Sequence, residues 1–155
     1  MSSRRPLREP EANTTFLVER AAARLEARIT SGVAAAGHPI RTAHSAVFVN
    51  IDREGTRLTH LAERALMTPQ AMSQLVDDLA ARGYLERVPD PSDRRAKLIR
   101  LTDLGFDALQ AAFDTIIGIE TSLGSLLGRD GLLQLREALR LIAELPPEGS
   151  SPDPG

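Results

Sequence analysis

The sequence predicts a mainly helical α+β protein in which one short β-hairpin interrupts a series of amphipathic helices. Apolar residues recur three or four positions apart through most of the chain, which is the period of a helix packed on one face. The period changes to about two only near residues 84–101. The chain is 42% hydrophobic but only 3% aromatic, so that Leu, Ala and Val must fill the core, and this composition suits helices.

Length and composition limit the classes of protein to consider. A chain of 155 residues fits one domain, or one protomer of an interlocked dimer. The absence of Cys excludes disulfide bonds and thiolate chemistry. No apolar run approaches the roughly 18 residues that a membrane span needs, and the N-terminus has no apolar signal-peptide core. We therefore expect a cytoplasmic protein without a membrane partner.

The N-terminal part predicts a leader followed by a long helix. Residues 1–12 hold arginines among Ser, Pro and Glu, and we expect them to be a disordered leader. Residues 13–37 predict an amphipathic helix that starts at the N-cap Asn13 and carries Val18 and Leu25 on its apolar stripe. Because the next domain is too small to cover this stripe, we expect part of it to meet another subunit.

The segment that follows is ambiguous at first. Thr42 is a suitable cap for the next element, but the apolar positions up to Ile51 fit a helix and a strand equally well. Residues 57–58 predict a brief strand, and Thr59 is expected to cap a short helix that ends at Arg64. With a turn at residues 65–67, this short helix and the next one form a helix–turn–helix.

The next helix has both of its ends specified locally. Thr68 is a good N-cap, Pro69 suits the first helical position, and Gly83 supplies the residue that ends a helix. The apolar stripe consists of Met72, Leu75, Val76 and Leu79. The opposite face carries Gln70, Ser73, Gln74 and Asp77. Gln and Ser can hydrogen-bond base edges in the major groove, although this face could also be merely solvated.

A basic hairpin follows directly. Residues 84–88 and 96–101 predict two strands, and the Pro, Asp and Ser residues between them predict a turn at residues 89–95. Arg94, Arg95 and Lys97 are expected to project from the tip, with Asp93 orienting a guanidinium group. From Arg82 to Arg100 the net charge is +3, whereas the chain as a whole carries −2. This segregation favours contact with nucleic acid, although a structural ion pair of the two arginines with Asp90 or Asp93 is an alternative.

The C-terminal part predicts two more amphipathic helices. Thr102 is expected to cap a long helix whose apolar residues include Phe113 and Ile116. A turn at residues 128–131 should precede a last helix with Leu135 and Leu139, and residues 146–155 predict a flexible tail. Residues 13–37 and 103–145 together expose more apolar surface than one small domain can cover, so we expect them to form a dimerisation stem.

The sequence contains no constellation that would indicate an enzyme. It has no Gly-rich phosphate loop, nucleophile elbow or catalytic-triad spacing. Its three histidines have no metal-ligand spacing and no Cys partners. We therefore expect no catalytic activity, no metal and no cofactor.

Several segments in fixed order resemble the MarR family of winged-helix transcriptional regulators. They are Leu61-Ala62-Glu63, the helix after Thr68, residues 83–87, residues 90–95 and residues 101–105. The resemblance implies a winged helix-turn-helix DNA-binding domain at residues 42–102, and it favours a helix in the ambiguous segment. It places Thr68, Gln70, Ala71, Ser73 and Gln74 on the recognition helix and Asp93, Arg94, Arg95 and Lys97 on the wing.

Two functional readings follow from this resemblance. The first is a homodimeric repressor that binds double-stranded DNA at a pseudo-palindromic operator and responds to a small aromatic or anionic effector. For that effector, the resemblance implies His38, Arg41, His44 and Phe48 as candidate pocket residues, with ordinary packing as the alternative for each. The second reading is a winged helix that serves as a protein-interaction or dimerisation module without specific DNA readout.

Overall fold

The computed structural model describes residues 13–146. The expected leader at residues 1–12, and the expected tail from residue 147 onward, lie outside the described residues. Two compact units make up the chain, and the division between them falls between Thr115 and Ile116.

The first unit begins with the long helix α1, Thr14–Ala35. As expected, Asn13 caps it, because the Asn13 side chain accepts the backbone N–H of Phe16 at 2.9 Å. Beyond the helix, Gly37 has a φ of 96° and turns the chain. The ambiguous segment is helical, but it forms two short pieces, the 3-10 helix η1 at Thr42–His44 and the helix α2 at Ser45–Phe48. Thr42 lies inside η1 and is not its cap, which is Arg41.

The start of the helix–turn–helix differs by one residue from the expectation. Strand β1 is Thr56–Arg57, and helix α3 is Leu58–Arg64, so Leu58 is helical and Thr59 does not cap the helix. The reason is packing. Starting the helix at Leu58 places that residue on the same face as Leu61 and Ala62, and all three contact the core.

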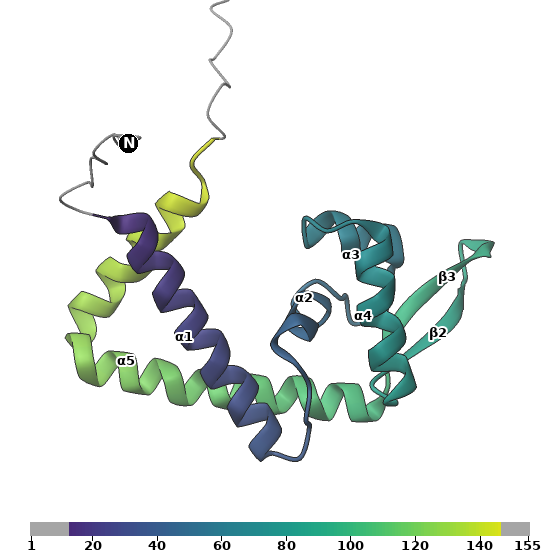
Figure 1. Cartoon of the computed structure of the whole chain (residues 1–155), viewed down its shortest axis with the longest axis horizontal. Coiled ribbons are helices and arrows are strands. Elements are labelled where there is room, and N and C mark those ends of the chain that lie inside the picture. The colour runs from purple at the N-terminus through teal and green to yellow at the C-terminus, as the bar shows by residue number, and fades with distance from the viewer. Residues whose placement is uncertain (1–12, 147–155) are drawn as a thin grey trace, which may run out of the picture. The chain divides into compact units, whose positions relative to one another are not determined.

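A small antiparallel sheet forms the wing. Strands β2, Leu85–Asp90, and β3, Asp93–Leu101, pair with each other, and β1 pairs with the other edge of β3. Figure 1 shows the β2–β3 hairpin projecting beside helix α4. The hairpin turn is shorter than expected, because Asp90 pairs with Asp93 after a shift in register between Pro89 and Asp90. As a result, Arg94 and Arg95 lie on β3 and not in a loop.

The core of the first unit lies between α3, helix α4 (Pro69–Ala81), the sheet and the start of helix α5 (Asp103–Ala143). Thr102 links the sheet to the start of α5. Its hydroxyl accepts the N–H of Gly105 at 3.2 Å and donates to the Gly83 carbonyl at 2.5 Å. Gly105 is required here, because a Cβ at this position would lie 2.2 Å from the Tyr84 carbonyl oxygen. Thr102 therefore caps α5, as expected, and fixes it to the end of α4.

The second unit contains the rest of α5. A single residue, Gly128 with φ 71° and ψ 168°, interrupts the helix, whereas the sequence predicted a turn over residues 128–131. One residue in the left-handed region is enough to redirect a helix, so residues 129–131 remain helical. Within this unit the side chains of Arg136 and Glu120 form an ion pair across the break.

Candidate nucleic-acid interface

Helix α4 is built as the sequence predicted. The Thr68 hydroxyl accepts the N–H of Ala71 at 3.2 Å, and Pro69 occupies the first turn. Gly83 has a φ of 84°, which lets the N–H of Tyr84 return to the Leu79 carbonyl at 2.9 Å and end the helix. The residues of the predicted apolar stripe are all buried: Met72, Leu75, Val76 and Leu79.

The opposite face of α4 is open to solvent. Thr68, Gln70 and Gln74 are exposed, while Ala71 and Ser73 are half-buried. These five residues are the predicted DNA contacts of the recognition helix, and they lie along one helix. Because their side chains are short or uncharged, the face they form could enter a groove without strong charge repulsion.

Asp77 lies on the same face, as the sequence predicted, and adds an acidic group that is not among the predicted DNA contacts. Its carboxylate accepts a hydrogen bond from an Arg87 guanidinium nitrogen at 2.5 Å, and the Ser73 hydroxyl lies 3.4 Å from its other oxygen. Arg87 lies on β2, so this ion pair joins α4 to the wing. Only the fold reveals it, because the two residues are ten positions apart on different elements.

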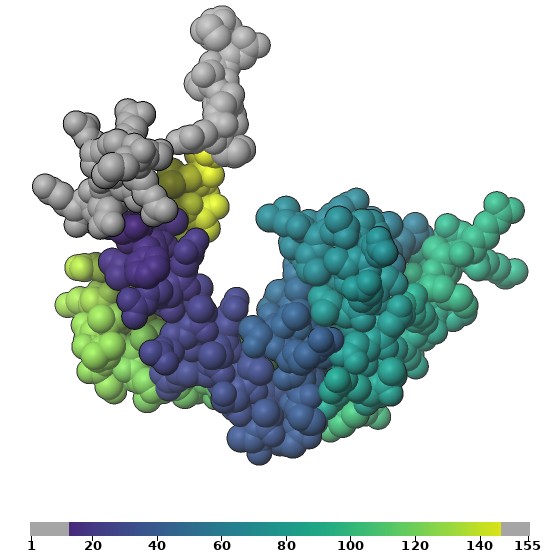
Figure 2. All heavy atoms as spheres, in the orientation of Figure 1, coloured from purple at the N-terminus to yellow at the C-terminus, as the bar shows by residue number. Residues whose placement is uncertain are grey.

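Three basic side chains near the wing tip have no acidic partner within residues 13–146. Arg94, Arg95 and Lys97 are exposed, and none of them forms an ion pair with any residue between 13 and 146. Figure 2 shows the hairpin tip standing out from the surface of α3 and α4. The alternative expectation, an ion pair of Arg94 or Arg95 with Asp90 or Asp93, is therefore wrong for the described part of the chain.

Both wing aspartates are engaged elsewhere. Asp90 accepts a hydrogen bond from Arg57 Nε at 2.7 Å, and the N–H and hydroxyl of Ser92 donate to its other oxygen at 2.8 and 2.6 Å. Asp93 accepts the backbone N–H of Arg95 at 3.0 Å, and its nearest guanidinium is that of Arg57 at 3.9 Å. The two aspartates thus hold the hairpin turn together, which leaves Arg94, Arg95 and Lys97 without an ion-pair partner among the described residues.

A buried histidine fixes the other end of α4. His44 is fully buried, its Nδ1 accepts the N–H of Arg41 at 3.0 Å, and its Nε2 lies 2.8 Å from a carboxylate oxygen of Asp78. Asp78 is on α4 and also binds Arg41 and Arg82 at 2.8 and 3.1 Å. Burial is the main cause that lowers the pKa of His44 below 6.5. The neutral ring with its proton on Nε2 satisfies both contacts.

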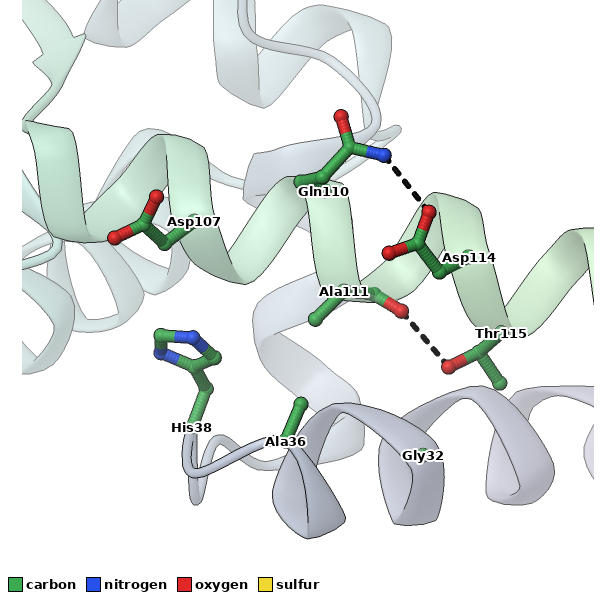
Figure 3. A pocket seen from close by; sticks show the side chains of 8 residues that line it. All are labelled: Gly32, Ala36, His38, Asp107, Gln110, Ala111, Asp114 and Thr115. Atoms are coloured by element: carbon green, nitrogen blue, oxygen red, sulfur yellow. Dashed lines mark hydrogen bonds between the residues drawn. The ribbon is translucent and has the colours of Figure 1, made fainter.

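The four residues expected to line an effector pocket do not share one hollow, although Arg41 contacts His44. His44 and Phe48 are buried in the first unit. His38 lines a hollow of about 430 Å³ between the end of α1 and α5. Figure 3 shows its ring directed toward the face of α5 that carries Asp107. Its Nδ1 is buried without a hydrogen-bond partner in the described part of the chain.

Arg41 lines a different hollow, of about 480 Å³. The walls of this hollow come from α1, η1, α2, the turn before α4, and α4 itself. Among the lining residues, Glu26 is on α1, Ser45 is on α2 and Gln74 is on α4. The hollow therefore reaches the helix that carries the predicted base-reading residues.

The residues predicted for the dimer stem are exposed or half-buried in the single chain. In the first unit Phe113 is 49% exposed, and Val18 and Leu25 are half-buried. In the second unit Ile116, Leu135 and Leu139 are exposed. Large apolar side chains that are left open on helices are typical of surfaces that another chain covers.

The described residues hold neither a metal-binding cluster nor a membrane-spanning helix. Between residues 13 and 146, no three His, Asp or Glu side chains are grouped so as to hold a metal ion. In the same range, none of the helices has the length and apolar character that crossing a membrane requires.

Known proteins match this chain both in sequence and in fold. The model of the MarR family matches residues 38–96. The transcriptional repressor CouR, in a structure bound to a 23-mer DNA duplex, is 29% identical with a TM-score of 0.70, and the match covers 84% of this chain and 92% of that one. No curated protein sequence matches the chain.

Two further structures are similar. CouR from Rhodococcus jostii RHA1 bound to p-coumaroyl-CoA is 25% identical with a TM-score of 0.69, and the match covers 88% of this chain and 98% of that one. Wild-type MarR from E. coli, in its apo form, is 19% identical with a TM-score of 0.69, covering 89% of this chain and all of the other. The second likeness concerns the fold alone.

Proposed function

We propose that this chain, which belongs to the MarR family, is a sequence-specific DNA-binding repressor of transcription. The observation that carries the proposal is the wing, where Arg94, Arg95 and Lys97 have no acidic partner among the described residues. Free cations on a projecting hairpin, next to a helix with a polar and largely uncharged face, suit a duplex with its regular phosphates. The similar repressor CouR has a structure with DNA bound.

In this proposal the two surfaces have different tasks. Helix α4 enters the major groove, where Gln70, Ser73 and Gln74 read base edges and Thr68 and Ala71 lie alongside. The wing residues Arg94, Arg95 and Lys97 contact phosphates or the neighbouring minor groove, and Asp93 keeps the turn closed. Regulation of transcription, and not catalysis, is the proposed activity, and it would take place in the cytoplasm.

The binding unit is proposed to be a homodimer. The apolar side chains left open on α1 and α5, Phe113 among them, would be covered by a second copy. A two-fold axis would place two α4 helices in successive major grooves, roughly 34 Å apart. The operator is therefore expected to be a pseudo-palindrome.

A small aromatic or anionic effector is proposed to regulate binding. We place it in the hollow lined by Arg41, where a guanidinium that attracts an anion lies beside one carboxylate, that of Glu26. The other hollow carries two carboxylates, Asp107 and Asp114, and no arginine or lysine. The volume of about 480 Å³ lies in the usual range for ligand sites. The similar CouR structure with p-coumaroyl-CoA supports a ligand that is both aromatic and anionic. Such a ligand acts only if it prefers one position of α4.

The test is selection of genomic fragments by the purified chain, followed by fluorescence anisotropy on a selected fragment at increasing salt. We expect nanomolar-range binding that weakens steeply between about 50 and 200 mM salt. A scrambled fragment of the same length is the control for sequence specificity. Absence of binding at about 50 mM salt would reject the proposal in favour of a protein-interaction module.

A further inference from the structure

Leu66 has a backbone conformation that its side chain disfavours. It lies in the turn between α3 and α4, and it is the one residue other than glycine with a positive φ, 53°, among residues 13–146. In this region the Cβ of an L-residue crowds the backbone, so that glycine is the usual choice. Leucine here carries a conformational cost that glycine would avoid.

The hydrogen bonds of the turn explain why the positive φ is needed. The N–H of Leu66 bonds to the Glu63 carbonyl at 3.1 Å, and the N–H of Met67 bonds to the Ala62 carbonyl at 2.8 Å. This is the Schellman arrangement that ends a helix, and it requires a left-handed residue at the position of Leu66. The fold therefore dictates the backbone conformation and leaves the side chain free.

The Leu66 side chain contributes nothing to the core. It is 95% exposed, whereas its neighbour Met67 packs against the core. A fully exposed leucine gains no burial energy, so it does not offset the backbone cost within this chain. Strain without local compensation indicates a role toward a partner.

The position of the side chain indicates which partner. Leu66 lies two residues before Thr68, the N-cap of α4, and hence at the start of the helix that the proposed function places in the major groove. Resting on that proposed function, we propose that Leu66 makes an apolar contact with the DNA. The contact would be with a carbon surface of the duplex, either a thymine 5-methyl group or a deoxyribose ring.

The experiment compares Leu66→Ala and Leu66→Gly with the unchanged chain on a fragment that the unchanged chain binds. Both variants should bind the fragment roughly five- to ten-fold more weakly, since each removes the apolar contact. Leu66→Gly should in addition unfold at a temperature roughly 2 °C higher than Leu66→Ala, because it relieves the positive φ. If Leu66→Gly unfolds at no lower temperature than the unchanged chain and yet binds DNA less well, damage to the fold cannot explain the loss of affinity.

Val49→Ala is the matched control. Val49 is also an exposed apolar residue, at 76%, but it follows α2 with an ordinary helical backbone. We expect this variant to bind DNA as the unchanged chain does.

Fragments with deoxyuridine in place of thymidine separate the two sources of the contact. If the 5-methyl group is the partner, the unchanged chain binds the uracil fragment more weakly and Leu66→Ala loses nothing further; if deoxyribose is the partner, the loss from Leu66→Ala is the same on both fragments.

Two outcomes would overturn the inference. One is equal DNA affinity for the unchanged chain and both Leu66 variants. The other is a change in sedimentation rather than in DNA affinity, which would assign Leu66 to a protein contact. In either case the unchanged chain still binds its fragment, so the proposed function stands; if the unchanged chain binds no DNA at all, the proposed function itself has failed.

Discussion

Arg57 on β1 reaches across β3 to Asp90 at the wing turn, where its Nε lies 2.7 Å from a carboxylate oxygen. The two residues are 33 positions apart in the sequence. Because Asp90 is almost completely buried, its charge is directed to Arg57 and Ser92 rather than to the exposed arginines of the wing. The Arg57–Asp90 ion pair therefore stabilises the hairpin turn and leaves Arg94, Arg95 and Lys97 available to bind a partner.

The first prediction concerns the acid sensitivity of the wing. Hydrogen bonds from Ser92, together with Arg57, lower the pKa of Asp90 from 3.8 to about 2. The depressed pKa means that the stabilisation is complete above pH 3.8 and is lost as the pH falls toward 2. The unfolding temperatures of the unchanged chain and of Asp90→Asn should therefore differ most above pH 3.8 and converge near pH 2. Glu54→Gln, which alters an exposed carboxyl group outside the wing turn, is the control; a constant difference across this pH range would contradict the assignment.

The second prediction concerns the free cations. Replacing Arg94 and Arg95 together with Ala should flatten the slope of log affinity against log salt by up to about two, since each phosphate contact contributes about 0.9. Thermal stability should hardly change, because neither side chain has an ion-pair partner among the described residues. Arg24→Ala with Arg28→Ala removes the same charge from α1 and should leave the slope unchanged. If the wing variant unfolds instead, the two arginines have a structural role.

The ends and faces of α4 could be predicted from the sequence because every signal is local. A cap at Thr68, a proline at the next position, a glycine at 83 and a stripe of period 3.6 all act within one helix. The length of the wing strands could not be predicted in the same way. It depends on the register shift at Pro89 and Asp90, which arises only when β2 and β3 pair.

Long-range polar contacts could also not be predicted from the sequence. His44 was a candidate ligand-binding residue, but the fold buries it against Asp78, which lies 34 positions away. The sequence offered an ion pair of Asp90 with the nearby arginines as one alternative, whereas the strand order β1-β3-β2 brings Arg57 to it instead. A buried polar group is satisfied by whichever partner the topology places beside it, and spacing along the chain does not encode this.

The third prediction concerns His44 and pH. Its pKa is lowered, mainly by burial, so the folded chain keeps the ring neutral at pH values where the unfolded chain protonates it. The contribution of the neutral His44 ring to the free energy of unfolding is therefore fully present above pH 6.5, and it falls as the pH drops below that value. Urea unfolding between pH 8 and 5.5 should show this loss in the unchanged chain and a smaller loss in His44→Gln. His60→Gln, at an exposed histidine, should follow the unchanged chain, and parallel curves for all three would rule out the buried titration.

The fourth prediction concerns the close contact of α1 with α5 within the first unit. A Cβ at Gly32 would lie 2.3 Å from Thr115 Oγ1 and 3.0 Å from Thr115 Cβ. Gly32→Ala should therefore lower the free energy of unfolding by roughly 1–3 kcal/mol. In a Thr115→Ala background the cost should fall by more than half, because the nearest atoms are gone while the Cβ contact remains. Urea denaturation of the two single variants and the double variant measures this coupling, and simple additivity would show that the helices do not meet at this point.

The last prediction tests the proposed dimer. Phe113 is 49% exposed on α5, and a carboxylate placed in a covered apolar seam would be desolvated without a partner. Phe113→Asp should therefore sediment as a monomer at concentrations where the unchanged chain is a dimer. It should lose affinity for a fragment with two half-sites but bind a single half-site as the unchanged chain does. Val49→Asp places the same charge on an exposed residue outside the predicted stem and should leave the dimer intact. A Phe113→Asp protein that remains a well-behaved dimer would show that this face of α5 is not the seam.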